Sequence, residues 1–373
     1  MRFRATLDII DRCLTVAACT AELDGCRQAL WHDRTDWLAV ISLANQHLVT
    51  PALWTAFNRY DLCQQLPDDV RSYLSLLHTR NAERNDRIRK QCIEIGRILS
   101  EAGIKAVLLK GVAWLLDGSL EAASDRMMRD IDLLVASEEV EVAARVLVGA
   151  GYKDSGESLV EANHYHYAPL LPPAGDISVE IHRDLACRVD LLPASEVIVS
   201  ACEVAQGLLL PSPDHRIVHN VIHAQIENGD FVGGTVSLRD TLDLARLVNR
   251  YGAEVDWIEL AKQARRRDFF RYLSGAVHVS HRVLQSRLPV PLVNFSSSFH
   301  ASRCIHQRRW LQINKAAEKL GRLSRALAWD RDAYVLRVPK ASLRSHVLVN
   351  KRRIQRAKAF LDRLNEERDD TLL

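Results

Sequence analysis

The sequence of 373 residues is informative first for what it lacks. None of its eight cysteines forms a C-x-x-C pair, and a chain of this length does not need disulfides to hold a core. We therefore expect reduced thiols and a cytoplasmic location. No run approaches 18 uninterrupted apolar residues, and Asp8, Asp11 and Arg12 interrupt the first apolar stretch. These features predict neither a membrane span nor a secretory signal.

The marks of several large enzyme classes are also missing. The chain contains no G-x-S-x-G, no Walker-type loop and no dinucleotide fingerprint, which argues against serine hydrolases, P-loop enzymes and dinucleotide-dependent enzymes. Aromatic residues make up only 6% of the chain, so stacking platforms for single-stranded nucleic acid are few. A formal net charge of +3 excludes a protein that coats polyanions.

The charge that is present is unevenly distributed. Residues 301–373 carry 18 basic and 8 acidic side chains, whereas the rest of the chain is acidic in balance. The basic runs at 265–267 and 351–358 suit phosphate contacts, but acids at 366–370 follow the second run and no recognised nucleic-acid module accompanies either. We interpret both runs as solvated helix faces and do not favour a nucleic-acid partner.

The apolar periodicity divides the chain into four regions. Residues 1–103 read as helical, 104–190 as a compact α/β unit, 191–300 as a helical domain and 301–373 as a basic, mostly helical C-terminal region. Within the α/β unit, short apolar or alternating runs at 104–109, 130–135, 164–171 and 177–182 predict strands. A long helix is expected from Pro67 to just before Gly103, because Pro and acids suit its first turn and Gly its end.

Paired carboxylates lie in the second predicted strand of the α/β unit. Asp130 and Asp132 share one face of a strand, where they repel each other unless a cation lies between them, and Mg²⁺ suits such oxygen ligands. Glu180 lies between apolar neighbours in the run 176–182 and offers the third carboxylate of a two-metal site. The alternative is an exposed strand edge carrying surface acids. The apolar surroundings of Asp130 and Asp132 argue against that alternative.

Lys110 and Gly111 stand between the first predicted strand and a short helix. A glycine there permits close approach of a phosphate, the helix supplies free N–H groups, and the lysine supplies charge. The pair is a weak signal alone. It gains weight because the paired aspartates follow about 20 residues later.

Histidines form two further patterns. His215, His219 and His223 recur every four residues on one helical face, without the glutamate of an H-E-x-x-H zinc motif. They are expected to line a cleft or a domain interface. His164 and His166 alternate with tyrosines and face either an acceptor pocket or solvent.

Together these segments resemble the bacterial branch of uncharacterised nucleotidyltransferases within the DNA polymerase beta-like nucleotidyltransferase superfamily. The resemblance covers about residues 30–265 and rests on three motifs, namely Leu109-Lys110-Gly111, Arg126…Asp130-Ile131-Asp132-Leu133-Leu134-Val135, and Val179-Glu180-Ile181-His182. It implies an α+β fold with a minimal polymerase-beta-like core, a small mixed sheet with helices, flanked by helical N- and C-terminal regions.

The resemblance also implies an activity, the transfer of an NMP group from an NTP such as ATP to an acceptor hydroxyl with release of pyrophosphate. Asp130, Asp132 and Glu180 would be catalytic and would hold two Mg²⁺ or Mn²⁺ ions. The nucleotide would be held by Lys110, Gly111, Arg126 and Arg129, and the candidate acceptor pocket comprises His182, His164, His166 and His223. The acceptor would be a small molecule, a peptide or protein side chain, or an RNA end.

One departure from the superfamily pattern leaves alternatives open. Val112 follows Gly111 where a serine or a second glycine is usual, so a serine contact to phosphate is missing. This favours, as the alternative, a catalytically idle member that senses nucleotide or binds protein. A third reading is an RNA-modifying transferase that uses the basic C-terminal region.

Overall fold

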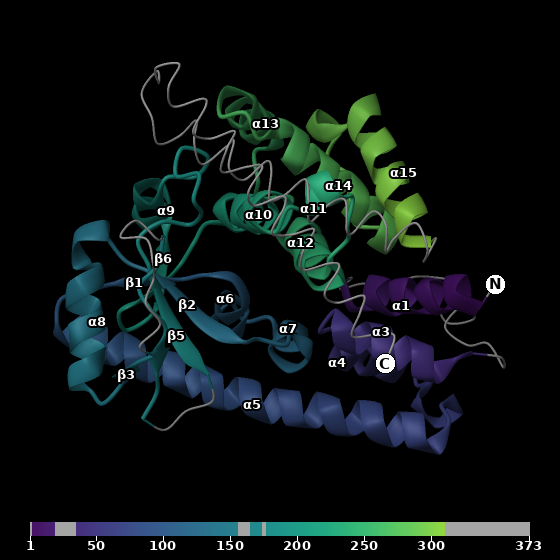
Figure 1. Cartoon of the computed structure of the whole chain (residues 1–373), viewed down its shortest axis with the longest axis horizontal. Coiled ribbons are helices and arrows are strands. Elements are labelled where there is room, and N and C mark those ends of the chain that lie inside the picture. Colours follow the sequence, from purple (N-terminus) through teal and green to yellow (C-terminus); the bar gives the residue numbers. More distant parts are fainter. Residues whose placement is uncertain (1, 19–34, 156–164, 174–176, 310–373) are drawn as a thin grey trace, which may run out of the picture.

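The computed structural model describes residues 2–18, 35–155, 165–173 and 177–309. A mixed seven-stranded sheet lies among helices from both ends of this part of the chain (Figure 1). The expected α+β fold, with a mixed sheet and helical flanks, is thereby confirmed. His164 and the predicted basic region beyond residue 309 lie outside the described residues.

The sheet has the order β3-β4-β5-β2-β1-β7-β6. Its strands are β1 (Ala106–Leu108), β2 (Asp130–Leu134), β3 (Lys153–Asp154), β4 (Leu170–Leu171), β5 (Ser178–His182), β6 (Cys202–Ala205) and β7 (Leu208–Leu210). Strand β2 pairs antiparallel with β1 and parallel with β5, in a register that sets Asp132 opposite Glu180. The two motif strands are therefore neighbours at the centre of the sheet.

Two expectations about which residues form strands were wrong. The chain was expected to be helical from residue 191, yet β6 and β7 form a hairpin whose second strand pairs parallel with β1. Gly207 adopts a φ of +72° in the turn, a conformation that suits glycine. The strand expected at 164–171 is reduced to β4 and a single bridge between His166 and His182.

The N-terminal helices are α1 (Arg2–Ala18), α3 (Trp37–Gln46), α4 (Thr50–Arg59) and α5 (Asp68–Glu101). Helix α5 confirms the predicted long helix, because it begins after Pro67 and ends just before Gly103, whose φ is +76°. Its apolar side, which includes Ile88, Cys92 and Ile95, packs under the sheet in one core with Leu108, Ile131 and Val179 (Figure 1). This core covers one face of β1, β2 and β5.

The remaining helices include α6 (Lys110–Leu116), α7 (Leu120–Asp125) and α8 (Val140–Gly149) beside the sheet. Toward the C-terminal end follow α9 (Ala194–Ser200), α10 (Pro213–Val221), a π-helical turn (Ile222–Glu227), α11 (Asp230–Gly233), α12 (Leu238–Tyr251), α13 (Trp257–Arg266), α14 (Phe270–Leu284) and α15 (Phe295–Arg309). A second core joins α10, α12, α13 and α14 to Val107, Leu109 and Leu134. The sheet is thus covered on both faces.

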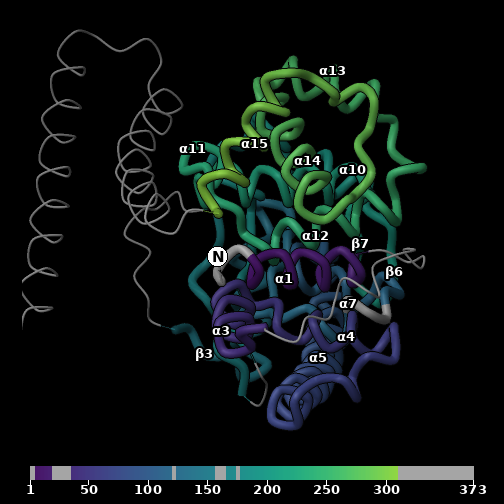
Figure 2. Tube along the Cα trace, turned by 90° about the vertical axis from the view of Figure 1, so that its right-hand side faces the viewer, coloured from purple at the N-terminus to yellow at the C-terminus, as the bar shows by residue number. Residues whose placement is uncertain are grey.

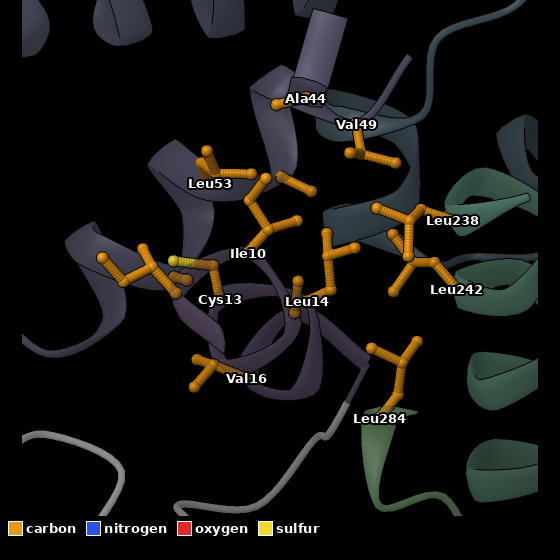
Figure 3. Close-up of a cluster of buried hydrophobic side chains, with 14 of the residues drawn as sticks. Ile10, Cys13, Leu14, Val16, Ala44, Val49, Leu53, Leu238, Leu242 and Leu284 are labelled. Atoms are coloured by element: carbon orange, nitrogen blue, oxygen red, sulfur yellow. The ribbon is translucent and has the colours of Figure 1, made fainter. Parts of the chain in front are cut away.

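A third core joins the N-terminal helices to those near the end of the described chain. Helix α1 contacts both α4 and α12, and it lies between them in Figure 2. Ile10 and Leu14 of α1 meet Leu53, Leu238 and Leu284 in a buried cluster (Figure 3). In this described part of the chain, no helix is long and apolar enough to cross a membrane.

Candidate active site

Strands β2 and β5 place three acids on one side of the sheet. Ile131 and Leu133 alternate with Asp130 and Asp132 and point into the core over α5, so the two acids point the other way, toward α10 and α12. Glu180 lies directly opposite Asp132 in the parallel register. The periodicity thus explains why acids occupy strands that are otherwise apolar.

Asp132 is the centre of this site. It is only 1% exposed, and its Oδ1 atom lies 2.7 Å from Lys110 Nζ and 2.9 Å from His182 Nε2. His182 is fully buried and its Nε2 also lies 3.7 Å from Glu180 Oε2. One buried carboxylate oxygen therefore faces a lysine and a histidine at the same time.

Burial and neighbouring charges shift the pKa values of the three acids in different directions. Burial alone would raise the pKa of Asp132, but the charge of Lys110 and the hydrogen bond to His182 hold it well below its usual range. Burial and the negative charge of Asp132 raise the pKa of Asp130 to about 6. The nearby His182 ring lowers the pKa of Glu180. Such divergence between neighbouring carboxyl groups is typical of functional sites.

A divalent cation fits the donor set. Ligand atoms of Asp132, Glu180 and His182 all lie within 4.8 Å of one another. Carboxylate oxygens suit Mg²⁺ and Mn²⁺, and imidazole is tolerated by transition metals. Asp130, Asp132 and Glu180 stay the predicted metal ligands; the ring of His182, a residue predicted for the acceptor pocket, lies beside the carboxylates and could also bind a metal.

Lys110 and Gly111 begin α6, directly after β1. Lys110 has a φ of +47°, which is unusual for a residue with a side chain. A Cβ atom on Gly111 would lie 2.6 Å from Met128 Cγ, so a larger residue here would have to displace the Met128 side chain. A contact between Gly111 and a phosphate stays a prediction.

Helix α5 fixes the segment that leads into β2. Asn81 Nδ2 donates to the Ser124 carbonyl oxygen at 2.8 Å, and Asn85 Nδ2 donates to the Arg126 carbonyl oxygen at 2.9 Å. Both amides are buried. Asn81 and Asn85 were not predicted, although two asparagines four residues apart on the apolar side of a helix are a usable signal, since buried amides require partners.

Helix α12 holds the same segment from the other side. Arg126 Nε lies 2.8 Å from Asp243 Oδ2, and Arg246 pairs with Asp125 at 2.7 Å; all four side chains are at most 6% exposed. Arg126, a predicted nucleotide ligand, is therefore engaged in a buried ion pair. Arg129, the other predicted arginine, has an exposed side chain.

The structure separates the predicted acceptor histidines. His166 Nε2 lies 3.9 Å from Glu180 Oε2, and the rings of Tyr165, His166 and His182 form a cluster with centroids 4.9 to 5.6 Å apart. His223 instead lines a pocket between α6, α10 and α12.

This pocket encloses about 590 Å³, including open solvent at its mouth. His215 and His219 line it with His223, as their helical spacing predicted for a cleft. Lys110 lines it too, so the pocket adjoins the carboxylates.

Residues 33–285, about two thirds of the chain, match the model of a family described as uncharacterised nucleotidyltransferase. The chain belongs to this family. No curated protein and no solved structure was found to match it.

Proposed function

We propose that the protein is a metal-dependent nucleotidyltransferase of the DNA polymerase beta-like superfamily, which moves an NMP group from an NTP such as ATP to an acceptor hydroxyl and releases pyrophosphate. The observation that carries this proposal is the placement of Asp130, Asp132 and Glu180 on one face of two adjacent parallel strands. Membership of a nucleotidyltransferase family supports it.

The three carboxylates would hold two divalent cations, with His182 beside them. Bound there, Mg²⁺ or Mn²⁺ would supply positive charge for the phosphate oxygens. Glu180, which lies near both His166 and His182, would accept the proton of the attacking hydroxyl. The acceptor would then enter beside the cluster of Tyr165, His166 and His182.

Lys110, Gly111 and Arg129 would hold the triphosphate. Arg126 would contribute indirectly, because its contacts fix the position of the chain at the start of β2. Lys110 already lies at the junction of the carboxylates and the pocket. The proposed acceptor is a small molecule, a peptide or protein side chain, or an RNA end. Cytoplasmic location and bacterial origin likewise stay predictions.

Transfer of label from each NTP, with Mg²⁺ or Mn²⁺ and cell extract as the source of acceptor, tests the proposal. Asp130→Asn should reduce transfer at least 100-fold, since it removes a group that acts directly on the reacting charges. Asp68→Asn is the matched control, because Asp68 pairs with Arg71 at the surface of α5 and is 90% exposed. Transfer by Asp130→Asn at the rate of the control would refute the assignment.

A catalytically idle, nucleotide-sensing or protein-binding member is the second candidate. The ion pair between Lys110 and Asp132 favours it, because a cation of the chain itself already neutralises the central carboxylate. So does Val112 at the position of the usual serine. Binding of Mg²⁺-NTP without pyrophosphate release in any extract would support this candidate, and pyrophosphate release that Asp130→Asn abolishes would exclude it.

A further inference from the structure

Four large apolar side chains are exposed at the surface where the chain passes from α14 into α15. Val290 belongs to a short 3₁₀ turn (Val290–Leu292) and is 83% exposed, and Val293, just after the turn, is 56% exposed. Phe295 and Phe299 of α15 are 86% and 65% exposed, and they share one side of the helix because they are four residues apart. We call these four residues the apolar patch. Apolar side chains that gather on a surface in this way mark an interaction site.

Helix α15 exposes its largest apolar side chains and buries smaller ones. The side of α15 that packs on α14 carries small or polar residues, namely Ser297, His300, Ala301 and Cys304. A phenylalanine is normally among the residues that a fold buries. The helix lies on the side of the molecule opposite α5 (Figure 1). The two phenylalanines therefore serve a contact outside the core of the described chain.

The surroundings of the apolar patch are basic. Residues 269–309 contain six arginines and no aspartate or glutamate. Arg282 and Arg287 are both exposed. Arg282 Nη2 lies 3.4 Å from Ser298 Oγ in the first turn of α15, and Arg287 precedes Val290 by three residues. The apolar patch thus has cationic side chains at its border.

Neighbouring elements do not cancel this positive charge. Within the described residues, one of the six arginines pairs with a carboxylate, namely Arg308 with Asp11 of α1. Helix α13 contacts the 3₁₀ turn, and residues 254–268, which include α13, carry four acidic and four basic side chains. The excess of positive charge beside the apolar patch is therefore real, and it selects an anionic partner.

The shape of the apolar patch decides which anionic partner fits. Side chains that are 83% and 86% exposed protrude from the surface, whereas side chains that line a groove are shielded by its walls. A protruding phenylalanine needs a partner that opens around it, and the interface of a bilayer does so. Phosphates of anionic lipids lie at the same level and bind arginine. A nucleic acid would engage the arginines but would leave the valines and phenylalanines in water.

We propose that the start of α15 and the 3₁₀ turn before it bind the surface of membranes that contain anionic phospholipids. Phe295 and Phe299 insert at the boundary of the acyl chains, and Arg282 and Arg287 contact headgroup phosphates. Binding of this kind is peripheral and requires no spanning helix. It would hold the candidate active site close to a membrane, whichever acceptor that site uses.

Sedimentation of the full chain with vesicles tests the proposal. The wild type should bind vesicles of phosphatidylglycerol and phosphatidylcholine in equal parts about tenfold or more tightly than vesicles of phosphatidylcholine alone, and added salt should weaken this binding. Phe295→Ser combined with Phe299→Ser should weaken it about tenfold or more, because two apolar side chains no longer leave water. Leu38→Ser is the matched control, since Leu38 of α3 is 81% exposed but lies outside the apolar patch.

A second pair of substitutions tests the charge. Arg282→Gln combined with Arg287→Gln should weaken binding to the anionic vesicles about tenfold and flatten its salt dependence, because two cations near the headgroups are lost. Lys262→Gln is the control, because it removes a charge from the exposed face of α13. All these substitutions replace exposed side chains, so the melting temperatures should equal that of the wild type.

Two results would overturn the proposal. The first is a wild type that binds neither kind of vesicle, or a Phe295→Ser, Phe299→Ser variant that binds as the wild type does. The second concerns a second copy of the chain as the partner. A wild type that sediments as a dimer, converts to a monomer on the same substitutions and ignores vesicles would assign the apolar patch to self-association. None of these measurements uses a nucleotide, so the outcome is independent of the proposed transfer.

Discussion

Replacement of Lys110 by methionine tests how the central carboxylate is neutralised. Lys110 Nζ lies 2.7 Å from Asp132 Oδ1, and the two side chains are 20% and 2% exposed. Methionine keeps most of the side-chain volume but removes the charge, and His182 is then the close side-chain partner that Asp132 keeps among the described residues. A hydrogen bond to a charged group contributes roughly 1.5–3 kcal/mol, and we expect the free energy of unfolding in EDTA to fall by about that amount.

The chain offers a matched control for this change. Lys105 pairs with Glu203 at 2.9 Å, nearly the same separation, but the side chains are 62% and 47% exposed. An exposed pair of this kind contributes about 0–1 kcal/mol, so Lys105→Met should change stability little. The difference between the two variants isolates the effect of burial from that of the lysine itself.

Added Mg²⁺ makes the same experiment informative about the metal. If Lys110 and the metal neutralise the same carboxylate, Lys110→Met should gain more stability from Mg²⁺ than wild type does, because no ammonium competes for Asp132. Urea titrations in EDTA and at several Mg²⁺ concentrations measure both effects. Equal, small losses in Lys110→Met and Lys105→Met would refute the reasoning about burial, and a smaller response to Mg²⁺ in Lys110→Met would refute competition.

Two further predictions concern stability. Asp243→Asn removes the carboxylate that pairs with the buried Arg126 guanidinium and should reduce the free energy of unfolding by about 3–5 kcal/mol. Arg126→Met combined with Asp243→Leu should recover most of that loss. Urea denaturation of both variants and the wild type measures this, and a loss in the double variant as large as that in Asp243→Asn would contradict it. Burial, with Arg charges nearby, lowers the pKa of His47 and of His300 from 6.5 to about 4. Between these two pH values the unfolded chain therefore binds more protons than the folded chain does. The free energy of unfolding should fall as the pH falls from 6.5 toward 4. Urea midpoints at pH 5 and 7 measure this fall, which His47→Gln should reduce; an unchanged slope would count against it.

The sequence predicted those parts of the fold that are marked by residues close together in the chain, such as an alternating pattern or the residues at a helix end. The alternation at 130–135 placed Asp130 and Asp132 on one side of a strand because side chains on a strand have a period of two. Helix α5 was predictable to within a residue or two, because Pro67 and Gly103 mark its ends. The pairing of β2 with β5, which sets Glu180 opposite Asp132, was not predictable, since register depends on contacts distant in sequence.

The parts that were missed lack such a signal. The run Leu208-Leu209-Leu210 is too short for its periodicity to distinguish a strand from a helix, and only its pairing with β1 decides. The buried ion pairs of Arg126 and Arg246 join residues more than 100 positions apart, so no local pattern announces them. The division of the chain at residues 103, 190 and 300 stays a prediction.

Arg126 shows why the helical flanks belong to the site although they carry no motif. Its carbonyl oxygen accepts a hydrogen bond from Asn85 of α5, and its guanidinium pairs with Asp243 of α12. A residue held at both its backbone and its side chain has little freedom, and Arg126 lies only four residues before Asp130. Helices about 150 residues apart in sequence thus converge on the segment that sets where β2 begins. Because a shift of about 1 Å in a catalytic group is enough to cost activity, the catalytic role that we propose for the carboxylates would depend on both flanks.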